Sequence, residues 1–147
     1  MTESPLELSG DDFRAMVAHA TAEIVRHVAS LPTQTLHATG GGKALARSLR
    51  EDLPESGAAD KVLLTQLVRR VVPRSFNTAS PGYLAYVPGG GLLHSAVADL
   101  VASAVNRYVG VWVAAPGLAQ IESNVVRWFC EIVGYAGSPT PGGILTT

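Results

Sequence analysis

A proline and three glycines, Pro88 to Gly91, stand directly before an apolar stretch with helical spacing, and this turn has the composition of a ligand-facing loop. Glycines before a helix let the backbone approach a ligand closely and leave N–H groups free to point at it. The positive end of the helix dipole then favours a carboxylate or a phosphate. Tyr83 and Tyr86, just upstream, could supply an aromatic wall. A plain tight turn is the simpler interpretation of the glycines taken alone.

The other residues that could bind a ligand or react give weaker evidence for a functional site. The run from Thr39 to Lys43 is similar to a phosphate-binding loop, but a Walker motif needs a glycine where His37 stands and a hydroxyl where Ala44 stands. We therefore predict a flexible loop there. The four histidines lack metal-ligand spacing, so we predict no metal site. Cys130, in an apolar run, is predicted to be a buried structural thiol and not a nucleophile.

The composition predicts a chain that covers part of its surface with another polypeptide. Only 16% of its 147 residues are charged and 47% are hydrophobic, whereas globular domains carry about 25% charged residues and small ones have the most surface to cover. An alanine- and valine-rich soluble domain is the alternative. The net charge of −1 favours neither nucleic acid nor an anionic membrane as a partner.

No secretion signal is expected, because the first residues are acidic and polar. The longest apolar stretch, Leu92 to Val105, is too short and too polar to span a bilayer. The expected location is therefore the cytoplasm.

The spacing of apolar residues predicts a mainly helical chain with short extended pieces. A capping box at Ser9 opens the first helix, Pro116 begins the last, and Gly134 ends it. The expected helices cover residues 9–31, 44–49, 58–72, 92–107 and 116–132, the extended pieces 83–87, 109–113 and 144–147, and the turns 74–82 and 138–143. The helix at 92–107 is apolar over most of its circumference and is predicted to be buried nearly all round.

Taken in order, these motifs resemble the group II pyridoxal-phosphate-dependent decarboxylases, the family of aromatic amino acid, histidine and glutamate decarboxylases. One departure is Ser80-Pro81, where the family often has a histidine-proline pair. The matching motifs, over about residues 60–147, are Tyr83-Leu84-Ala85-Tyr86-Val87-Pro88 with Gly89-Gly90-Gly91, Ala98-Asp99-Leu100, Asn106-Arg107, Gly110-Val111-Trp112-Val113-Ala114-Ala115-Pro116, Ile121-Glu122 with Trp128, and Gly142-Gly143-Ile144-Leu145-Thr146-Thr147.

The resemblance implies a fold-type I enzyme, in which a large α/β domain binds the cofactor and two subunits build each active site. Residues 1–82 would form a helical dimerisation segment that wraps around the partner subunit, and residues 83–147 would begin the large cofactor-binding domain. Thr146 and Thr147 would lie at the entrance to the phosphate-binding turn. The residues that the resemblance places near the substrate are Tyr86, Val87, Pro88, Gly89 and Gly90, with Tyr108 and Trp112 reaching the neighbouring subunit's site.

The same resemblance implies that no catalytic residue lies in this chain. The phosphate turn, the histidine that stacks on the pyridine ring, the aspartate that pairs with its nitrogen and the Schiff-base lysine would all follow residue 147. Lys43 and Lys61 stand in the wrong context to replace that lysine. Because decarboxylation needs the ring as an electron sink and the lysine as its anchor, the chain alone is expected to be inactive. A complementary polypeptide would hold most of the pyridoxal phosphate, in a homodimer-like or heteromeric assembly.

Two other functions stay open. A related enzyme of the family could divert the same chemistry toward oxygen, as an oxidative deaminase or aldehyde synthase. Alternatively, the chain could be a non-catalytic interaction subunit that keeps the dimer-forming half of the fold. The amino acid substrate is not specified by the residues present, because Tyr86 and Val87 could face an aromatic, an aliphatic or a polar side chain.

Overall fold

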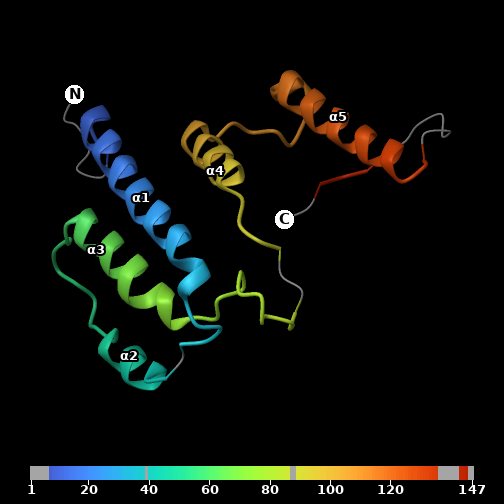
Figure 1. The fold of residues 1–147 in the computed structure, drawn as a ribbon. Coiled ribbons are helices and arrows are strands. Elements are labelled where there is room, and N and C mark those ends of the chain that lie inside the picture. Colours follow the sequence, from blue (N-terminus) through green and yellow to red (C-terminus); the bar gives the residue numbers. More distant parts are fainter. Residues whose placement is uncertain (1–6, 39, 87–88, 136–142, 146–147) are drawn as a thin grey trace. The chain divides into compact units, whose positions relative to one another are not determined.

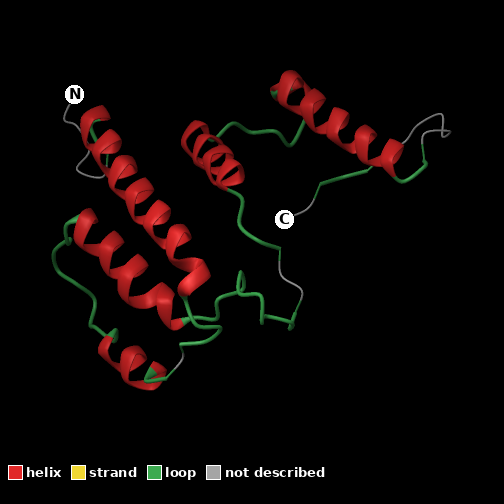
Figure 2. Cartoon of the chain, viewed as in Figure 1, coloured by secondary structure: helices red, strands yellow, loops and turns green. Residues whose placement is uncertain are grey.

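The computed structural model describes residues 7–38, 40–86, 89–135 and 143–145, and these residues are mainly helical (Figures 1 and 2). Within them no β-strand forms, and one isolated bridge joins His37 to Phe76. The prediction of a mainly helical chain is confirmed. The helices are α1 (Gly10–Ser30), α2 (Gly42–Ser48), α3 (Asp60–Gln66), α4 (Leu93–Val105) and α5 (Pro116–Ile132), with the short turns η1 (Leu31–Thr33), η2 (Leu67–Val71), η3 (Val72–Arg74) and η4 (Trp112–Ala114).

The chain divides into two compact units, Met1–Gly90 and Gly91–Thr147, so the division falls within the glycine turn. The first unit holds α1, α2 and α3, and the second holds α4 and α5. α1 and α3 lie side by side (Figure 1).

Helix α1 begins as its sequence predicts. Ser9 is extended and its Oγ accepts a hydrogen bond from the Asp12 N–H at 3.1 Å, which satisfies one of the free N–H groups of the first turn. The same hydroxyl donates to the Asp12 carboxylate at 2.6 Å. The helix ends at Ser30, one residue before Leu31-Pro32, where the sequence predicts its end.

Hydrogen bonds between polar side chains join α1 to α3 and to η2. His19 Nε2 lies 2.9 Å from Thr65 Oγ1. One turn further, Glu23 accepts two hydrogen bonds from Arg69, at 2.7 and 2.8 Å, and another from Arg26. Glu23 is 1% exposed. Sequence periodicity does not predict this cluster, because Glu23 and Arg69 are 46 residues apart.

The helix predicted over residues 58–72 is present but changes its winding. α3 continues into the π-helical turn η2 and then into the 3₁₀ turn η3, which contains Pro73. Such π turns are rare and widen the helix by one residue. Within η2, Arg69 reaches α1, whereas Arg70 donates to Ser48 Oγ of α2 at 2.6 Å. η2 therefore links the other two helices of the unit.

Helix α4 differs from its prediction in burial. It is a helix, as expected, and ends at Val105; the next residue, Asn106, has a left-handed φ of 44°, which is typical of the position after a helix. Every residue of α4 is exposed. The prediction that this helix is buried nearly all round is wrong for the chain by itself, because such burial needs apolar surface from other elements on every side.

Helix α5 is confirmed at both ends. Pro116 occupies its first turn, where a missing N–H costs nothing. At its other end Gly134 has a φ of +84°, the Gly134 N–H donates to the Glu131 carbonyl, and the Tyr135 N–H donates to the Cys130 carbonyl. These two bonds are the Schellman pattern. Cys130 is half-buried, so its predicted full burial is wrong.

The predicted extended pieces are the least accurate part of the sequence interpretation. Residues 109–113 contain a bend followed by the 3₁₀ turn Trp112–Ala114, and residues 83–86 form no strand. Ile144 and Leu145 pair with no strand among the described residues, and the Leu145 N–H donates to Glu122 Oε1 at 3.4 Å. Thr146, Thr147 and the turn at 138–142 lie outside the described residues. Short segments of this kind become strands only when a sheet edge is available.

No hydrophobic side chain among the described residues is buried. The two buried side chains are both polar, Glu23 and Asn77. Apolar burial is the main source of stability in a folded domain, so this unusual pattern agrees with the composition. Large exposed apolar residues stand on every major helix, among them Phe13, Ile24, Leu63, Val97, Val101, Ile121, Trp128, Phe129 and Ile132.

Candidate functional site

A hollow of about 430 Å³ in the first unit is lined by Tyr83 and Tyr86, the two tyrosines that the sequence predicts to form an aromatic wall. Its lining is aromatic and apolar, apart from one imidazole and two phenol hydroxyls. The described residues that line it include no carboxylate, lysine or arginine. The residues that line the hollow are Leu36, His37, Phe76, Gly82, Tyr83, Leu84, Ala85 and Tyr86.

Two segments far apart in the sequence meet to build this hollow. The antiparallel bridge between His37 and Phe76 pairs the segment after α1 with the segment after η3. The Asn77 N–H donates to the Leu36 carbonyl at 2.9 Å and extends that pairing. The rings of Phe76 and Tyr83 lie 6.3 Å apart, centre to centre, at 49°, within the range of stabilising aromatic pairs.

Tyr86 has an unusual backbone at the edge of the hollow. Its φ is +59°, a left-handed conformation that is uncommon for a residue other than glycine. Its side chain is 88% exposed. The extended strand predicted for residues 83–87 is therefore wrong up to Tyr86, because a left-handed residue turns the chain out of a β-strand. Strained conformations of this kind often occur where a side chain must face a ligand.

The remaining predicted site residues are not all placed by the structure. Gly89 and Gly90 are exposed, and no heavy atom lies within 4 Å of where their side chains would begin. That space is what close approach of a ligand requires. Val87 and Pro88 lie outside the described residues, as do Thr146 and Thr147. Their roles in binding substrate or cofactor stay predictions.

A second hollow, of about 640 Å³, lies in the second unit at the start of α5. Arg107 and Tyr108 line it together with residues of the first turns of that helix. Trp112 was predicted to act with Tyr108 but does not line this hollow; it lies in η4 and is 68% exposed. The structure therefore places only Tyr108 of that pair beside a cavity.

The ring of Tyr108 folds back over Gly110, and only a glycine leaves room for it. A Cβ added at Gly110 would overlap the Tyr108 ring atoms.

Changing Gly110 to alanine should therefore move the Tyr108 ring and leave stability nearly unchanged. The overlapping atoms are at the far end of a flexible, exposed side chain, so the ring can swing away at a cost within about 0.5 kcal/mol. The ring proton signals of Tyr108 should shift in NMR spectra, whereas the control variant Gly57→Ala, with nothing within 4 Å, should not shift them. Unchanged Tyr108 signals in Gly110→Ala would contradict this packing.

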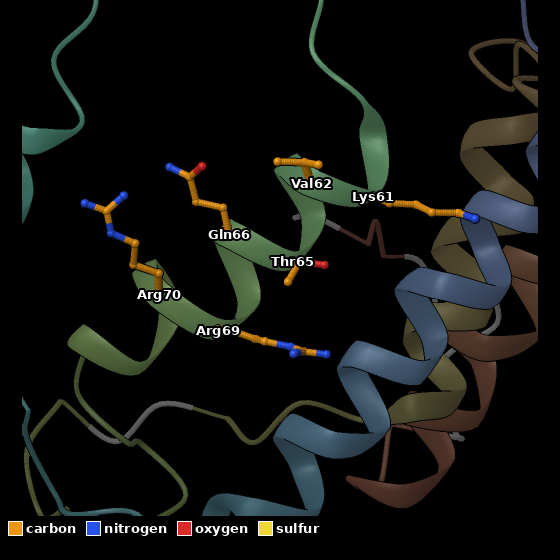
Figure 3. A pocket seen from close by; sticks show the side chains of 6 residues that line it. All are labelled: Lys61, Val62, Thr65, Gln66, Arg69 and Arg70. Carbon is orange, nitrogen blue, oxygen red and sulfur yellow. The ribbon is translucent and has the colours of Figure 1, made fainter.

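A third hollow lies on the surface of α3 and η2 and is lined by five basic or polar side chains and by Val62 (Figure 3). Lys61, Thr65 and Arg69 point toward α1, whereas Gln66 and Arg70 point to the other side of the helix. Arg69 is engaged by Glu23 and Arg70 by Ser48. These groups diverge and two are already paired, so they do not form a converging anion site.

In the first unit, the carboxyl group of Glu23 has a strongly shifted pKa. Hydrogen bonds from Arg69, and then from Arg26, lower the pKa of the Glu23 carboxyl from 4.5 to about 2. The same contact raises the pKa of Arg69. Sequence reasoning missed both partners, and the nearest sequence signal is the i, i+3 spacing of Glu23 and Arg26 within one helix.

The chemistry of the aromatic hollow fits the side chain of a ligand and not a phosphorylated cofactor. A phosphate needs cationic groups or converging N–H donors, and an aldehyde cofactor needs a lysine amine. The lining of the hollow supplies neither. Within the described residues, no three His, Cys, Asp or Glu side chains gather as a metal site, and no helix is long and apolar enough to cross a membrane.

Comparison with known proteins identifies the class to which this chain is related. It is 32% identical over 133 residues to an aromatic-L-amino-acid decarboxylase of Bacillus atrophaeus, across 90% of this chain and 28% of that protein. It is 25% identical over 147 residues to tryptophan decarboxylase 1 of Oryza sativa subsp. japonica, across 94% of this chain and 29% of the relative. It is also 29% identical over 90 residues to human histidine decarboxylase, across 58% of this chain and 14% of the relative.

These relatives place the chain in the group II pyridoxal-phosphate-dependent decarboxylase family, as a match to the N-terminal segment. Within that family, the relatives named here that match 90% or more of the chain are aromatic-L-amino-acid, tyrosine/DOPA and tryptophan decarboxylases. The chain spans somewhat more than a quarter of their length: 28% of the Bacillus protein and 29% of the rice protein. No family model matches the sequence, and no solved structure matches it.

Proposed function

We propose that this chain supplies the N-terminal segment of a pyridoxal-phosphate-dependent amino acid decarboxylase, where it contributes substrate-pocket and dimer-interface residues. The observation that carries the proposal is the 32% identity to an aromatic-L-amino-acid decarboxylase over 90% of the chain. Activity then requires the part of the enzyme that bears the cofactor lysine. By the same relationship, the chain belongs to a fold-type I enzyme, with residues 1–82 as a dimerisation segment and residues 83–147 as the start of the cofactor domain.

In this proposal the aromatic hollow receives the substrate side chain. Its walls come from Phe76, Tyr83 and Tyr86, and the described residues that line it include no acid, lysine or arginine. Apolar and aromatic walls bind an aromatic side chain by excluding water and by offset or edge-to-face ring contacts. The carboxylate and ammonium of the substrate would lie outside the hollow.

Pyridoxal phosphate supplies the electron sink that decarboxylation needs, and the described residues do not fit its phosphate or its aldehyde. The cofactor is therefore assigned mainly to the complementary part of the enzyme. The role of this chain is to bind and orient the side chain of the substrate and to keep water from it. Tyr108, beside the second hollow, would contribute to the neighbouring subunit's site.

The exposed apolar surface supports an assembly with another polypeptide. None of the hydrophobic side chains among the described residues is buried, and large exposed apolar side chains in such number are typical of a chain that is covered by a partner. The partner that best fits is the remainder of the same enzyme, because the relatives are about three to four times longer than this chain, which covers 28% of the Bacillus protein.

The test is to measure the products of the complete enzyme. A protein that joins this segment to the remainder of a homologous decarboxylase, loaded with pyridoxal phosphate, should release carbon dioxide and the corresponding amine in equal amounts from an aromatic amino acid. Oxygen uptake with aldehyde formation would instead indicate the oxidative alternative. A folded, cofactor-loaded protein that releases no carbon dioxide from any amino acid would overturn the proposal.

A further inference from the structure

We infer that Asn77 is a positioning residue, which holds the aromatic wall of the hollow in the place where a substrate side chain meets it. This inference rests on the proposed function for its consequence in catalysis. Its structural part rests only on contacts among residues of the first unit.

Asn77 is one of the two buried side chains among the described residues, with 6% exposure. It is uncharged and polar, so burial is costly unless its amide is hydrogen bonded. Both ends of the amide are used. Its Nδ2 donates to the carbonyl of Leu31 at 3.1 Å, and its Oδ1 accepts from the Ala79 N–H at 3.1 Å.

The first of these bonds ties the loop to the end of α1. Leu31 immediately follows that helix, and its carbonyl accepts this bond as well as one from the Gln34 N–H at 3.2 Å. The Asn77 N–H also donates to the Leu36 carbonyl at 2.9 Å. Asn77 therefore fixes two points of the segment 31–37 to the segment that carries the aromatic residues.

The second bond begins a series of hydrogen-bonded turns that leads to the aromatic wall. The Asn77 side chain accepts from Ala79, its carbonyl accepts from the Ser80 N–H at 3.1 Å, and the Ser80 carbonyl accepts from the Tyr83 N–H at 2.9 Å. The Tyr83 ring then lies against Phe76, the residue before Asn77. The position of Tyr83 is thus set from Asn77 in both directions, through the turns that follow Asn77 and through the ring of Phe76 that precedes it.

Asparagine suits this position better than its closest replacements. Aspartate keeps the acceptor for the Ala79 N–H but loses the donor to the Leu31 carbonyl and buries a charge. Alanine loses both bonds. This difference allows the two bonds to be separated experimentally, since Asn77→Asp removes one and Asn77→Ala removes both.

The structural test uses the 147-residue chain itself. Asn77→Ala should raise the hydrogen-exchange rates of the Ala79, Ser80 and Tyr83 amides by about tenfold or more, because their closed turns lose the anchor. Asn77→Asp should have a smaller effect at Ala79. Asn124→Ala, which breaks only a bond within α5, is the matched control. Amides of α1 near His19 report whether the unit still folds. Unchanged exchange at Ser80 and Tyr83 in a folded Asn77→Ala chain overturns the inference.

The functional test uses the complete enzyme and separates positioning from general damage. A misplaced aromatic wall should raise KM for an aromatic amino acid about fivefold to tenfold in Asn77→Ala while kcat changes little, because the wall contacts the substrate side chain in both ground and transition states. Asn124→Ala should change neither constant. A lower kcat with unchanged KM would overturn the inference. Absence of turnover in the unaltered enzyme would instead contradict the proposed function, and the exchange experiment would still decide the role of Asn77.

Discussion

Replacing Glu23 with glutamine should remove the largest acid-sensitive contribution to the stability of the first unit. The Glu23 carboxylate is buried and accepts hydrogen bonds from Arg69 and Arg26. These bonds lower its pKa from 4.5 to about 2. The unfolded chain therefore takes up a proton more readily than the folded chain, so the stabilisation is complete above about pH 4.5 and is lost as the pH falls toward 2.

The measurement is the urea midpoint of unfolding as a function of pH. For the unaltered chain the midpoint should fall between pH 4.5 and 2, whereas for Glu23→Gln it should be lower at neutral pH and should change less over that range. The control is Arg14→Gln, which breaks a pair between two exposed side chains and should lower stability by at most about 1 kcal/mol. Parallel pH curves for the unaltered chain and Glu23→Gln would show that Glu23 does not carry the effect.

The second large effect is expected at Tyr86 of the complete enzyme. Changing Tyr86 to alanine should lower kcat/KM for an aromatic amino acid about tenfold or more, because it removes one wall of the hollow. A well-placed aromatic pair contributes about 0.5–1.5 kcal/mol beyond the area that it buries, and about 1.4 kcal/mol is a factor of ten. Tyr86→Phe keeps the ring and should retain most of the activity.

The left-handed backbone of Tyr86 allows a sharper variant. Tyr86→Asn removes the ring but places a residue that tolerates a φ of +59°. It should therefore lose activity to the same extent as Tyr86→Ala while the chain stays at least as stable. Tyr135→Ala, at an exposed tyrosine after α5, is the matched control. Equal activity of the Tyr86→Ala and Tyr135→Ala enzymes would remove Tyr86 from the substrate site.

The local signals in the sequence predicted the helices well. A serine cap at Ser9, a proline in the first turn at Pro116 and a glycine at Gly134 each act on the nearest backbone groups, so their effect can be derived without knowledge of the fold. The same holds for the turn chemistry of residues 74–82. Asparagine, serine, proline and glycine are turn formers wherever they occur.

The long-range contacts could not be derived in this way. Glu23 and Arg69, like Leu31 and Asn77, are 46 residues apart, and no periodicity relates them. The left-handed Tyr86 likewise has no composition signal, because tyrosine favours strands. The aromatic hollow was therefore only partly predictable: Tyr83 and Tyr86 stood out as residues, but His37, Phe76 and Asn77, which complete or hold the hollow, did not.

Burial was the property on which sequence and structure differed most. The apolar circumference of α4 and the position of Cys130 in an apolar run both indicate an interior, yet α4 is exposed and Cys130 is half-buried. The pattern of apolar residues in a sequence indicates which side chains are buried in the functional assembly. The exposure described above is that of the chain by itself. The difference is therefore a measure of the surface that we propose a partner covers.

The most direct test of the central claim is to titrate this chain into the separately produced remainder of a homologous decarboxylase, loaded with pyridoxal phosphate, and to follow carbon dioxide release from an aromatic amino acid. Neither polypeptide alone should release carbon dioxide, and the rate should rise with added chain to a plateau at equimolar amounts. A rate that is the same with and without the chain, although the two form a stable complex, would contradict the account.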